Sequence, residues 1–150
     1  MSIKIILPVV PKAQQRPKFC NRGGFVKSYK ANTQVAEEVA IENLLLPYRP
    51  ATPLTGALFL GVKVYLPIPQ SKSNKWKNNA ISGIERPTTK PDLDNLIKNI
   101  KDCLTRLSFW RDDAQVVGYL ETGKFYGEQP RWELEIISQE ELKPSQASLI

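Results

Sequence analysis

The chain has 150 residues, which is the length of one domain with its own hydrophobic core. Its formal net charge is +6, and because no acidic residue precedes Glu37, we expect a positive face beside an acidic one. Such polarity suits a polyanion held next to a metal ion, although ordinary solubility charge would give the same total. The sequence has no histidine, which excludes an imidazole base and a histidine-bound zinc ion. Any chemistry must therefore use carboxylates, lysine and a hard cation.

The two cysteines, Cys20 and Cys103, form no metal-ligand spacing and no disulfide framework. We therefore expect free thiols in a reducing compartment, and a cytoplasmic location. The apolar run at 3–10 is interrupted by Lys4 and Pro8, and it predicts a strand rather than a signal peptide. We expect no membrane partner, because no apolar segment is long enough to cross a bilayer.

A basic segment follows the first strand, over residues 11–30. Phe19, Phe25 and Tyr29 are interleaved with its cationic side chains, and a Gly-Gly pair predicts a turn. Cations mixed with flat rings favour contact with phosphates and unstacked bases, although a hairpin of any basic protein can look similar. The cationic residues of this segment are Lys12, Arg16, Lys18, Arg22, Lys27 and Lys30.

A helix is predicted over 32–46, with Asn32 or Thr33 as its N-cap. Its apolar side is expected to carry Val35, Val39 and Ile41, and its solvated side Glu37, Glu38 and Glu42.

The clearest strand is at 57–66, where alternate apolar residues point to the core and Phe59, Lys63 and Tyr65 point to the other face. A second basic and aromatic segment, at 71–81, is predicted to be a loop. Its basic and aromatic residues are Lys72, Lys75, Trp76 and Lys77.

Residues 92–107 predict an amphipathic helix, because their apolar members recur every three or four positions. Asp92 and Asp94 lie at its start, where a carboxylate can accept from free backbone N–H groups and meets the positive end of the helix dipole. Lys98 lies one turn beyond Asp94, on the polar side. The apolar residues are Leu93, Leu96, Ile97, Ile100, Cys103, Leu104 and Leu107.

A second acidic pair, Asp112 and Asp113, follows this helix. Two strands are predicted after it, at 114–125 and 131–137, joined by a hairpin-like turn. The polar end of the chain, 138–150, is expected to fray.

If the first of these strands returns beside the start of the helix, Asp113 meets Asp92 and Asp94. Three convergent carboxylates repel one another unless a cation is present, and oxygen-only ligands favour Mg²⁺ or Mn²⁺ over zinc. Such an ion can polarise a phosphoryl oxygen and activate water, so phosphodiester hydrolysis is the reaction that fits. A purely structural alternative stays open, with Asp92 as a cap, Asp94 paired with Lys98, and the second acidic pair in a turn.

Two other interpretations of the Asp-Leu-Asp motif at 92–94 fail. An EF-hand loop would need a ligand at Leu96, glycine at Ile97 and glutamate at Cys103. An aspartyl-phosphate phosphatase would place its Asp-x-Asp after a buried strand near the N-terminus, whereas residues 86–91 precede it here.

Three stretches of the sequence combine into one pattern. Lys-Pro-Asp-Leu-Asp-Asn-Leu-Ile-Lys at 90–98 opens the amphipathic helix, and Phe-Trp-Arg-Asp-Asp-Ala-Gln-Val-Val at 109–117 follows it. Pro-Lys-Ala-Gln-Gln-Arg-Pro-Lys at 11–18 precedes both. The pattern resembles the RusA family of Holliday-junction resolvases, whereas residues 31–56 and 68–86 carry no matching signature.

The resemblance implies a single α+β domain over 1–150, with a mixed β-sheet packed by two helices. It also implies a homodimer with Mg²⁺-dependent endonuclease activity on branched DNA, often encoded by phage or prophage genes. The implied catalytic residues are Asp92, Asp94, Asp113 and Lys98, of which the three aspartates would bind the metal. The residues expected to hold DNA arms are Lys12, Arg16, Lys18, Lys72, Lys75 and Lys77.

Two competing interpretations remain. A non-catalytic DNA-binding protein would use its carboxylates only as caps and ion pairs, and metal-dependent nicking of DNA would separate it from a nuclease. Hydrolysis of a small phosphate ester is disfavoured, because the basic segments are spread over too much of the chain to serve one small pocket.

Overall fold

The computed structural model describes residues 2–13, 18–22, 25–29 and 32–142. Its central strand is β4 (Leu58–Pro67), which is the strand that the alternating pattern predicts. Leu58, Leu60, Val62 and Val64 are fully buried on one face, and the side chains between them on the other face are half-buried, apart from the glycine. The predicted separation of a core face and a partly covered face is confirmed.

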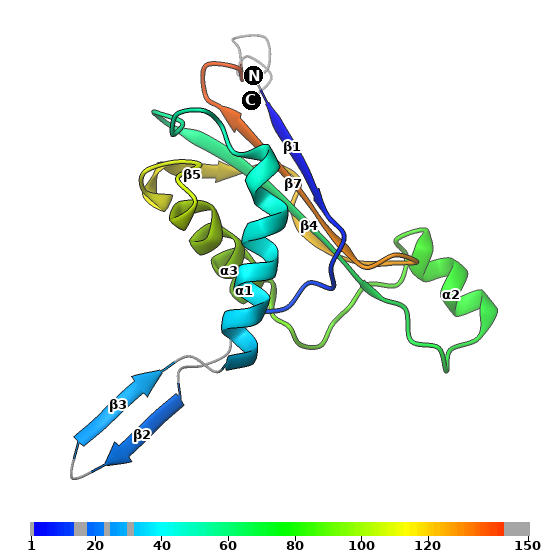
Figure 1. Cartoon of the computed structure of the whole chain (residues 1–150). Coiled ribbons are helices and arrows are strands. Elements are labelled where there is room, and N and C mark those ends of the chain that lie inside the picture. Colours follow the sequence, from blue (N-terminus) through cyan, green and yellow to red (C-terminus); the bar gives the residue numbers. More distant parts are fainter. Residues whose placement is uncertain (1, 14–17, 23–24, 30–31, 143–150) are drawn as a thin grey trace.

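Four further strands complete a mixed sheet around β4 (Figure 1). The order is β1 (Ile3–Leu7), β7 (Arg131–Ser138), β4 and β5 (Val116–Tyr119), and β6 (Gly123–Gly127) also pairs with β4, further along it. Strand β7 is antiparallel to both β1 and β4, whereas β5 and β6 are parallel to β4.

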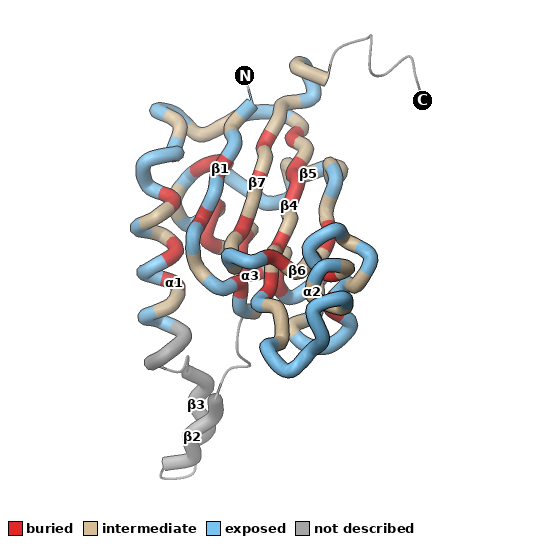
Figure 2. Tube along the Cα trace, turned by 90° about the vertical axis from the view of Figure 1, so that its right-hand side faces the viewer, coloured by how far each residue is buried: buried red, intermediate tan, exposed pale blue. Residues whose placement is uncertain are grey.

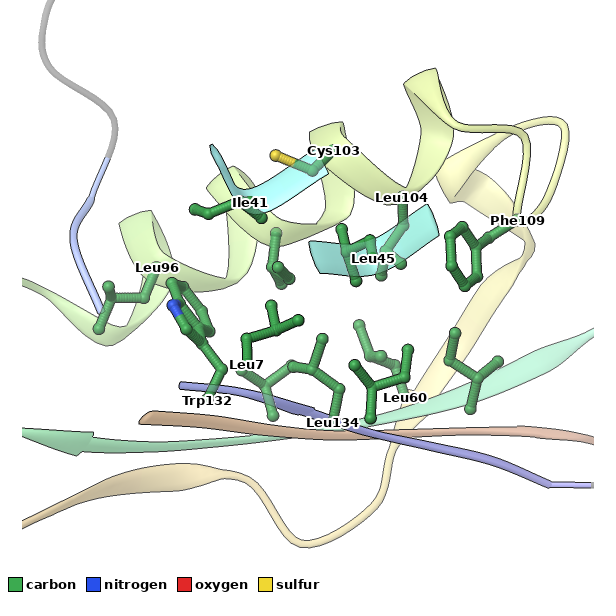
Figure 3. Packing of buried hydrophobic residues seen from close by; sticks show 14 of the residues in the cluster. Leu7, Ile41, Leu45, Leu60, Leu96, Cys103, Leu104, Phe109, Trp132 and Leu134 are labelled. Atoms are coloured by element: carbon green, nitrogen blue, oxygen red, sulfur yellow. The ribbon is translucent and has the colours of Figure 1, made fainter. Parts of the chain in front are cut away.

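Two helices, α1 (Asn32–Leu45) and α3 (Leu93–Arg106), cover one face of this sheet. Figure 3 shows their apolar side chains pointing down onto Leu7, Leu60, Trp132 and Leu134 of the strands. The predicted α+β class with a mixed sheet is confirmed. The buried residues that the two helices supply are Ile41, Leu45, Leu96, Ile100, Cys103 and Leu104.

The apolar side of α1 differs from the prediction. Val35 and Val39 are 45% and 49% exposed, whereas Glu38 is buried. The reason is Arg106 of α3, which forms ion pairs with Glu38 at 3.8 Å and with Glu42 at 2.7 Å and so brings the acidic side of α1 towards its neighbour. The side chains of 32–34, which include the predicted N-cap, lie outside the described residues.

The predicted loop at 71–81 is wrong, because a third helix, α2 (Asn74–Ile81), forms there. The Ser73 hydroxyl accepts from the Trp76 N–H at 3.2 Å and caps its first turn. Trp76 packs edge-on against Tyr126 of β6, with 5.3 Å between ring centroids. The helix is largely exposed (Figure 2), and with only Ala80 buried it has no long apolar stripe that could be recognised in the sequence.

The strand predicted at 114–125 is two strands, β5 and β6, separated by residues 120–122. Both pair with β4. Between them, Thr122 bonds the connecting residues to β4, because its hydroxyl accepts from the Val62 N–H at 3.1 Å. The expected hairpin between β6 and β7 is also wrong, because β4 lies between them. Gly127 is aligned with Pro67, so residues 128–130 pass over the end of β4.

Short strands and turns make up the remaining described segments. Strands β2 (Lys18–Arg22) and β3 (Phe25–Tyr29) form a separate antiparallel pair. A 3₁₀ turn, η1 (Leu46–Tyr48), ends α1, and a second, η2 (Asp113–Gln115), precedes β5. Part of the predicted frayed end is bonded, since Gln139 N–H donates to the Ala57 carbonyl, and 143–150 lie outside the described residues. In the described part of the chain, no helix combines the length and the apolar character needed to cross a bilayer.

Candidate functional site

Helix α3, turn η2 and strand β5 together line a hollow of about 290 Å³, referred to below as the acidic hollow. Asp94, Lys98 and Lys101 lie at spacings of four and three along α3, which places them on one side of the helix. Asp113 comes from η2 and Tyr119 from the end of β5. Ile97 completes the lining. The strand that carries Tyr119 therefore returns beside α3, as the sequence analysis supposed, and it brings Asp113 to Asp94.

The two aspartates of the second acidic pair have different tasks. The Asp112 carboxylate accepts from the Ala114 N–H at 2.9 Å, and the Gln115 side-chain oxygen accepts from the Asp112 N–H at 3.1 Å. This reciprocal arrangement is a capping box that closes η2. Asp113 is exposed and lines the acidic hollow, so the second aspartate of the pair is the one available to a ligand.

Gln115 also ties this turn to the segment that precedes β4. Its side-chain N–H₂ donates to the carbonyls of Leu54 and Gly56, at 3.0 and 3.1 Å. Leu54 is held from the other side, because its N–H donates to the Phe109 carbonyl at 2.8 Å. Neither role of Gln115 was predicted. The cap has a local signal, a glutamine three residues after an aspartate, whereas the bonds to Leu54 and Gly56 join residues 59 or more positions apart and have none.

Asp92 lies at the N-cap of α3, but its carboxylate makes no capping hydrogen bond. It lines a neighbouring hollow of about 580 Å³, with Lys12 and Lys90 among the other lining residues. Within residues 2–13, 18–22, 25–29 and 32–142, no three acidic or cysteine side chains are close enough together to bind a metal ion as they stand. The structure thus brings Asp94 and Asp113 into one hollow and places Asp92 in the next.

Only the last part of the purely structural alternative is confirmed, since the second acidic pair lies in turn η2. Asp92 does not cap α3 with its side chain, and between Asp94 and Lys98 there is no ion pair. Both charges of that i, i+4 pair therefore face the acidic hollow without neutralising each other by direct contact. Two carboxylates and no nitrogen or sulfur ligand fit a hard divalent cation such as Mg²⁺.

Two residues that the sequence analysis missed hold the segment leading to Asp92. Lys124 of β6 donates from Nζ to the Thr89 carbonyl at 2.6 Å. Arg86 donates from Nε to the Lys124 carbonyl, and its guanidinium lies 3.9 Å from the ring centroid of Phe125. Residues 86–89 are therefore bonded to β6 at both ends, through Arg86 and Thr89. Nothing in the local sequence signals these contacts, because they join residues 35 or more positions apart.

The basic residues expected to contact DNA fall into two groups. Lys12 is exposed next to the hollow that contains Asp92, and it pairs with Glu37 at 3.1 Å. Lys72, Lys75 and Lys77 lie on α2 or just before it, and Lys72 is 5.1 Å from the ring centroid of Trp76. Arg16 and the side chain of Lys18 lie outside the described residues.

The sequence is similar to known proteins over most of its length. A family model described as endodeoxyribonuclease RusA matches residues 8–137. The chain is 41% identical over 136 residues to "Uncharacterized protein YqaN" of Bacillus subtilis (strain 168), across 89% of this chain and 94% of that protein. It is 49% identical over 49 residues to the crossover junction endodeoxyribonuclease rusA of Lactococcus phage r1t, across 33% of this chain and 37% of that protein. The chain therefore belongs to the RusA family of endodeoxyribonucleases.

Proposed function

We propose that this protein is a Mg²⁺-dependent, structure-selective endonuclease that resolves Holliday junctions by phosphodiester hydrolysis as a homodimer. The observation that supports it most directly is the acidic hollow, in which Asp94 and Lys98 of α3 meet Asp113 of η2. Family membership supports the nuclease activity, and the phage relative is named for crossover junctions.

Asp92, Asp94 and Asp113 would hold the metal ion, and Lys98 would contact the scissile phosphate. The oxygen-only donors fit Mg²⁺, and Mn²⁺ prefers the same ligands. When bound, such a cation polarises a phosphoryl oxygen and activates water for attack. Asp94 and Lys98 are one turn apart on α3, so a phosphate drawn towards Lys98 is brought beside the carboxylates. Asp92 is two positions from Asp94, at the start of the same helix.

Basic residues of the segments at 11–18 and 71–81 would hold the arms of a junction. These residues are Lys12, Arg16, Lys18, Lys72, Lys75 and Lys77. Contacts of this kind position the DNA without reading its sequence. A substrate of this kind also supports the expected cytoplasmic location, because the protein must share a compartment with the DNA it cuts.

A homodimer suits the two-fold symmetry of a four-way junction, because a C₂ dimer presents two identical active sites. It can be tested with a heterodimer of one wild-type and one Asp94→Asn chain on a supercoiled cruciform plasmid. One working site should leave nicked circles in place of linear product. Wild-type protein that binds the junction as a monomer would contradict the dimer.

The test of the proposed function is a gel of a four-way junction and of a linear duplex, each with Mg²⁺ and with EDTA. We expect cleavage of the junction only with Mg²⁺, little cleavage of the duplex, and no cleavage by Asp94→Asn. The alternative, a DNA-binding protein without catalysis, predicts that wild type and Asp94→Asn both bind the junction and that neither cuts it.

A further inference from the structure

Two polar residues of the acidic hollow have no task in the mechanism above. They are Lys101, from α3, and Tyr119, the last residue of β5. Lys101 Nζ lies 3.4 Å from the Tyr119 hydroxyl oxygen and 5.8 Å from the centroid of its ring. The lysine is therefore held at the wall of the hollow by a neutral partner rather than by a carboxylate.

The position of Tyr119 is not explained by core packing. Its side chain is 50% exposed, at the edge of the sheet where β5 pairs only with β4 among the described strands. An aromatic side chain half in water contributes less to the core than a buried one, yet here it orients a charged group. The contact between Lys101 and Tyr119 thus indicates that the positive charge of Lys101 is held at the acidic hollow to meet a ligand.

The charges of the acidic hollow indicate what this ligand is. Asp94 and Asp113 contribute two negative charges, and Lys98 and Lys101 contribute two positive charges. Lys98 is assigned to the scissile phosphate, so the charge of Lys101 is the one without a phosphate partner. Because each phosphodiester carries one negative charge, a second lysine in the hollow suits a second phosphate.

The spacing of the two lysines agrees with two neighbouring phosphates. Lys98 and Lys101 are three residues apart on one side of α3, which is about 4.5 Å of rise along the helix. Successive phosphates of one DNA strand are separated by roughly 3.4 Å of rise along the duplex axis. Two flexible lysine side chains at this separation can each reach a different phosphate of the same strand.

We propose that Lys101, oriented by Tyr119, binds the phosphate next to the scissile one on the cleaved strand. This proposal rests on the proposed function, because Lys98 and the carboxylates define which phosphate is scissile. Lys101 is a substrate-binding residue of this flanking subsite, and Tyr119 is a positioning residue that acts through Lys101.

The test couples Lys101 to one phosphate at a time. Junctions are prepared in which single phosphates around the branch point are replaced by neutral methylphosphonates, and their Kd is measured in EDTA, where no cutting occurs. For wild type, neutralising the flanking phosphate should weaken binding by about fivefold. Lys101→Met should bind the unmodified junction more weakly by a similar factor. Neutralising the flanking phosphate should not weaken its binding further, whereas neutralising any other contacted phosphate should weaken it as in wild type.

Two further variants complete the experiment. Lys4→Met removes an exposed lysine of β1 outside the acidic hollow, so it should respond to every methylphosphonate as wild type does. Tyr119→Phe keeps the ring and removes the hydroxyl, so it should show part of the Lys101→Met effect at the same phosphate. With Mg²⁺, Lys101→Met should raise KM several-fold while kcat changes little, because its contact exists before and during the reaction.

The proposal is overturned if each methylphosphonate around the branch point weakens junction binding by the same factor in wild type and in Lys101→Met. This failure can be separated from failure of the proposed function. If Lys101 is not coupled to any phosphate but Mg²⁺-dependent cutting is intact, only the flanking subsite is overturned. Intact coupling with no cutting by wild type overturns only the catalytic assignment.

Discussion

The buried side-chain amide of Asn99 donates a hydrogen bond from Nδ2 to the backbone carbonyl of Lys12, at 2.8 Å. Asn99 is 5% exposed and lies in the middle of α3, between the apolar residues that face the core. Residues 11–13 line the same hollow as Asp92. One polar side chain of the core therefore fastens the start of the basic segment beside the candidate site.

Asn99→Ala should lower the free energy of unfolding by about 1 to 3 kcal/mol, because the Lys12 carbonyl loses its partner. Urea denaturation measures this loss. Asn78→Ala, an exposed position of α2, is the control and should change the same quantity by less than about 0.5 kcal/mol. Equal effects of the two substitutions would show that the bond to Lys12 contributes nothing to stability.

Gln115→Glu should lower kcat on a junction by tenfold or more, on the order of what misplacing a catalytic group costs. The substitution removes the donors to Leu54 and Gly56 and adds a negative charge beside their carbonyl oxygens, so the turn that presents Asp113 loses its anchor. Binding of the junction in EDTA should be unchanged. Gln139→Glu, on an exposed position after β7, is the control, and a normal kcat for Gln115→Glu would remove the positioning role.

Mg²⁺ or Mn²⁺ at millimolar concentration should raise the Tm of wild type, because a ligand that binds only the folded state stabilises it. Asp94→Asn should abolish this shift by removing a carboxylate of the acidic hollow. Asp112→Asn makes a matched control, since an asparagine can still cap η2 and Asp112 does not line the hollow. If differential scanning fluorimetry gives the same shift for wild type and Asp94→Asn, the metal lies elsewhere.

Replacing Lys72, Lys75 and Lys77 together by alanine should flatten the salt dependence of junction binding. Each phosphate contact that is lost reduces the slope of log K against log salt concentration by about 0.7 to 0.9. Alanine favours helix, so α2 should persist, and circular dichroism can verify this. An unchanged slope in a titration of salt would exclude α2 from the DNA interface.

Stability should depend on pH through Cys103. Burial raises the pKa of its thiol from 9.0 to about 11, although the nearby Arg106 lowers it. The folded state therefore keeps the thiol proton more strongly than the unfolded chain, so this contribution is complete below about pH 9 and is lost as pH rises towards 11.

Cys103→Ala measures that contribution, because all other titrating groups are shared with wild type. The advantage of wild type over the variant in urea denaturation should shrink by about 2 kcal/mol between pH 8.5 and pH 11. Parallel stability curves over this range would contradict a buried neutral thiol.

Features of the fold that depend on near neighbours in the chain can be predicted from the sequence alone. The three- and four-residue recurrence of apolar side chains predicts α3, and strict alternation predicts β4, because each periodicity follows from the geometry of one element. The acidic motifs at 92–94 and 112–113 similarly indicated the chemistry and the family, since both depend on which side chains are present and in what order.

Only the tertiary structure decided which of these side chains meet. The acidic hollow exists because β5 pairs in parallel with β4 and returns beside α3, which brings Tyr119 and Asp113 to the side of the helix that carries Asp94. The local sequence does not predict that Asp92 is separated from Asp113. It also does not predict the hydrogen bonds by which Asn99 and Gln115 anchor distant segments. These relationships join residues far apart in the chain, and strand pairing and burial of the shared core bring them together.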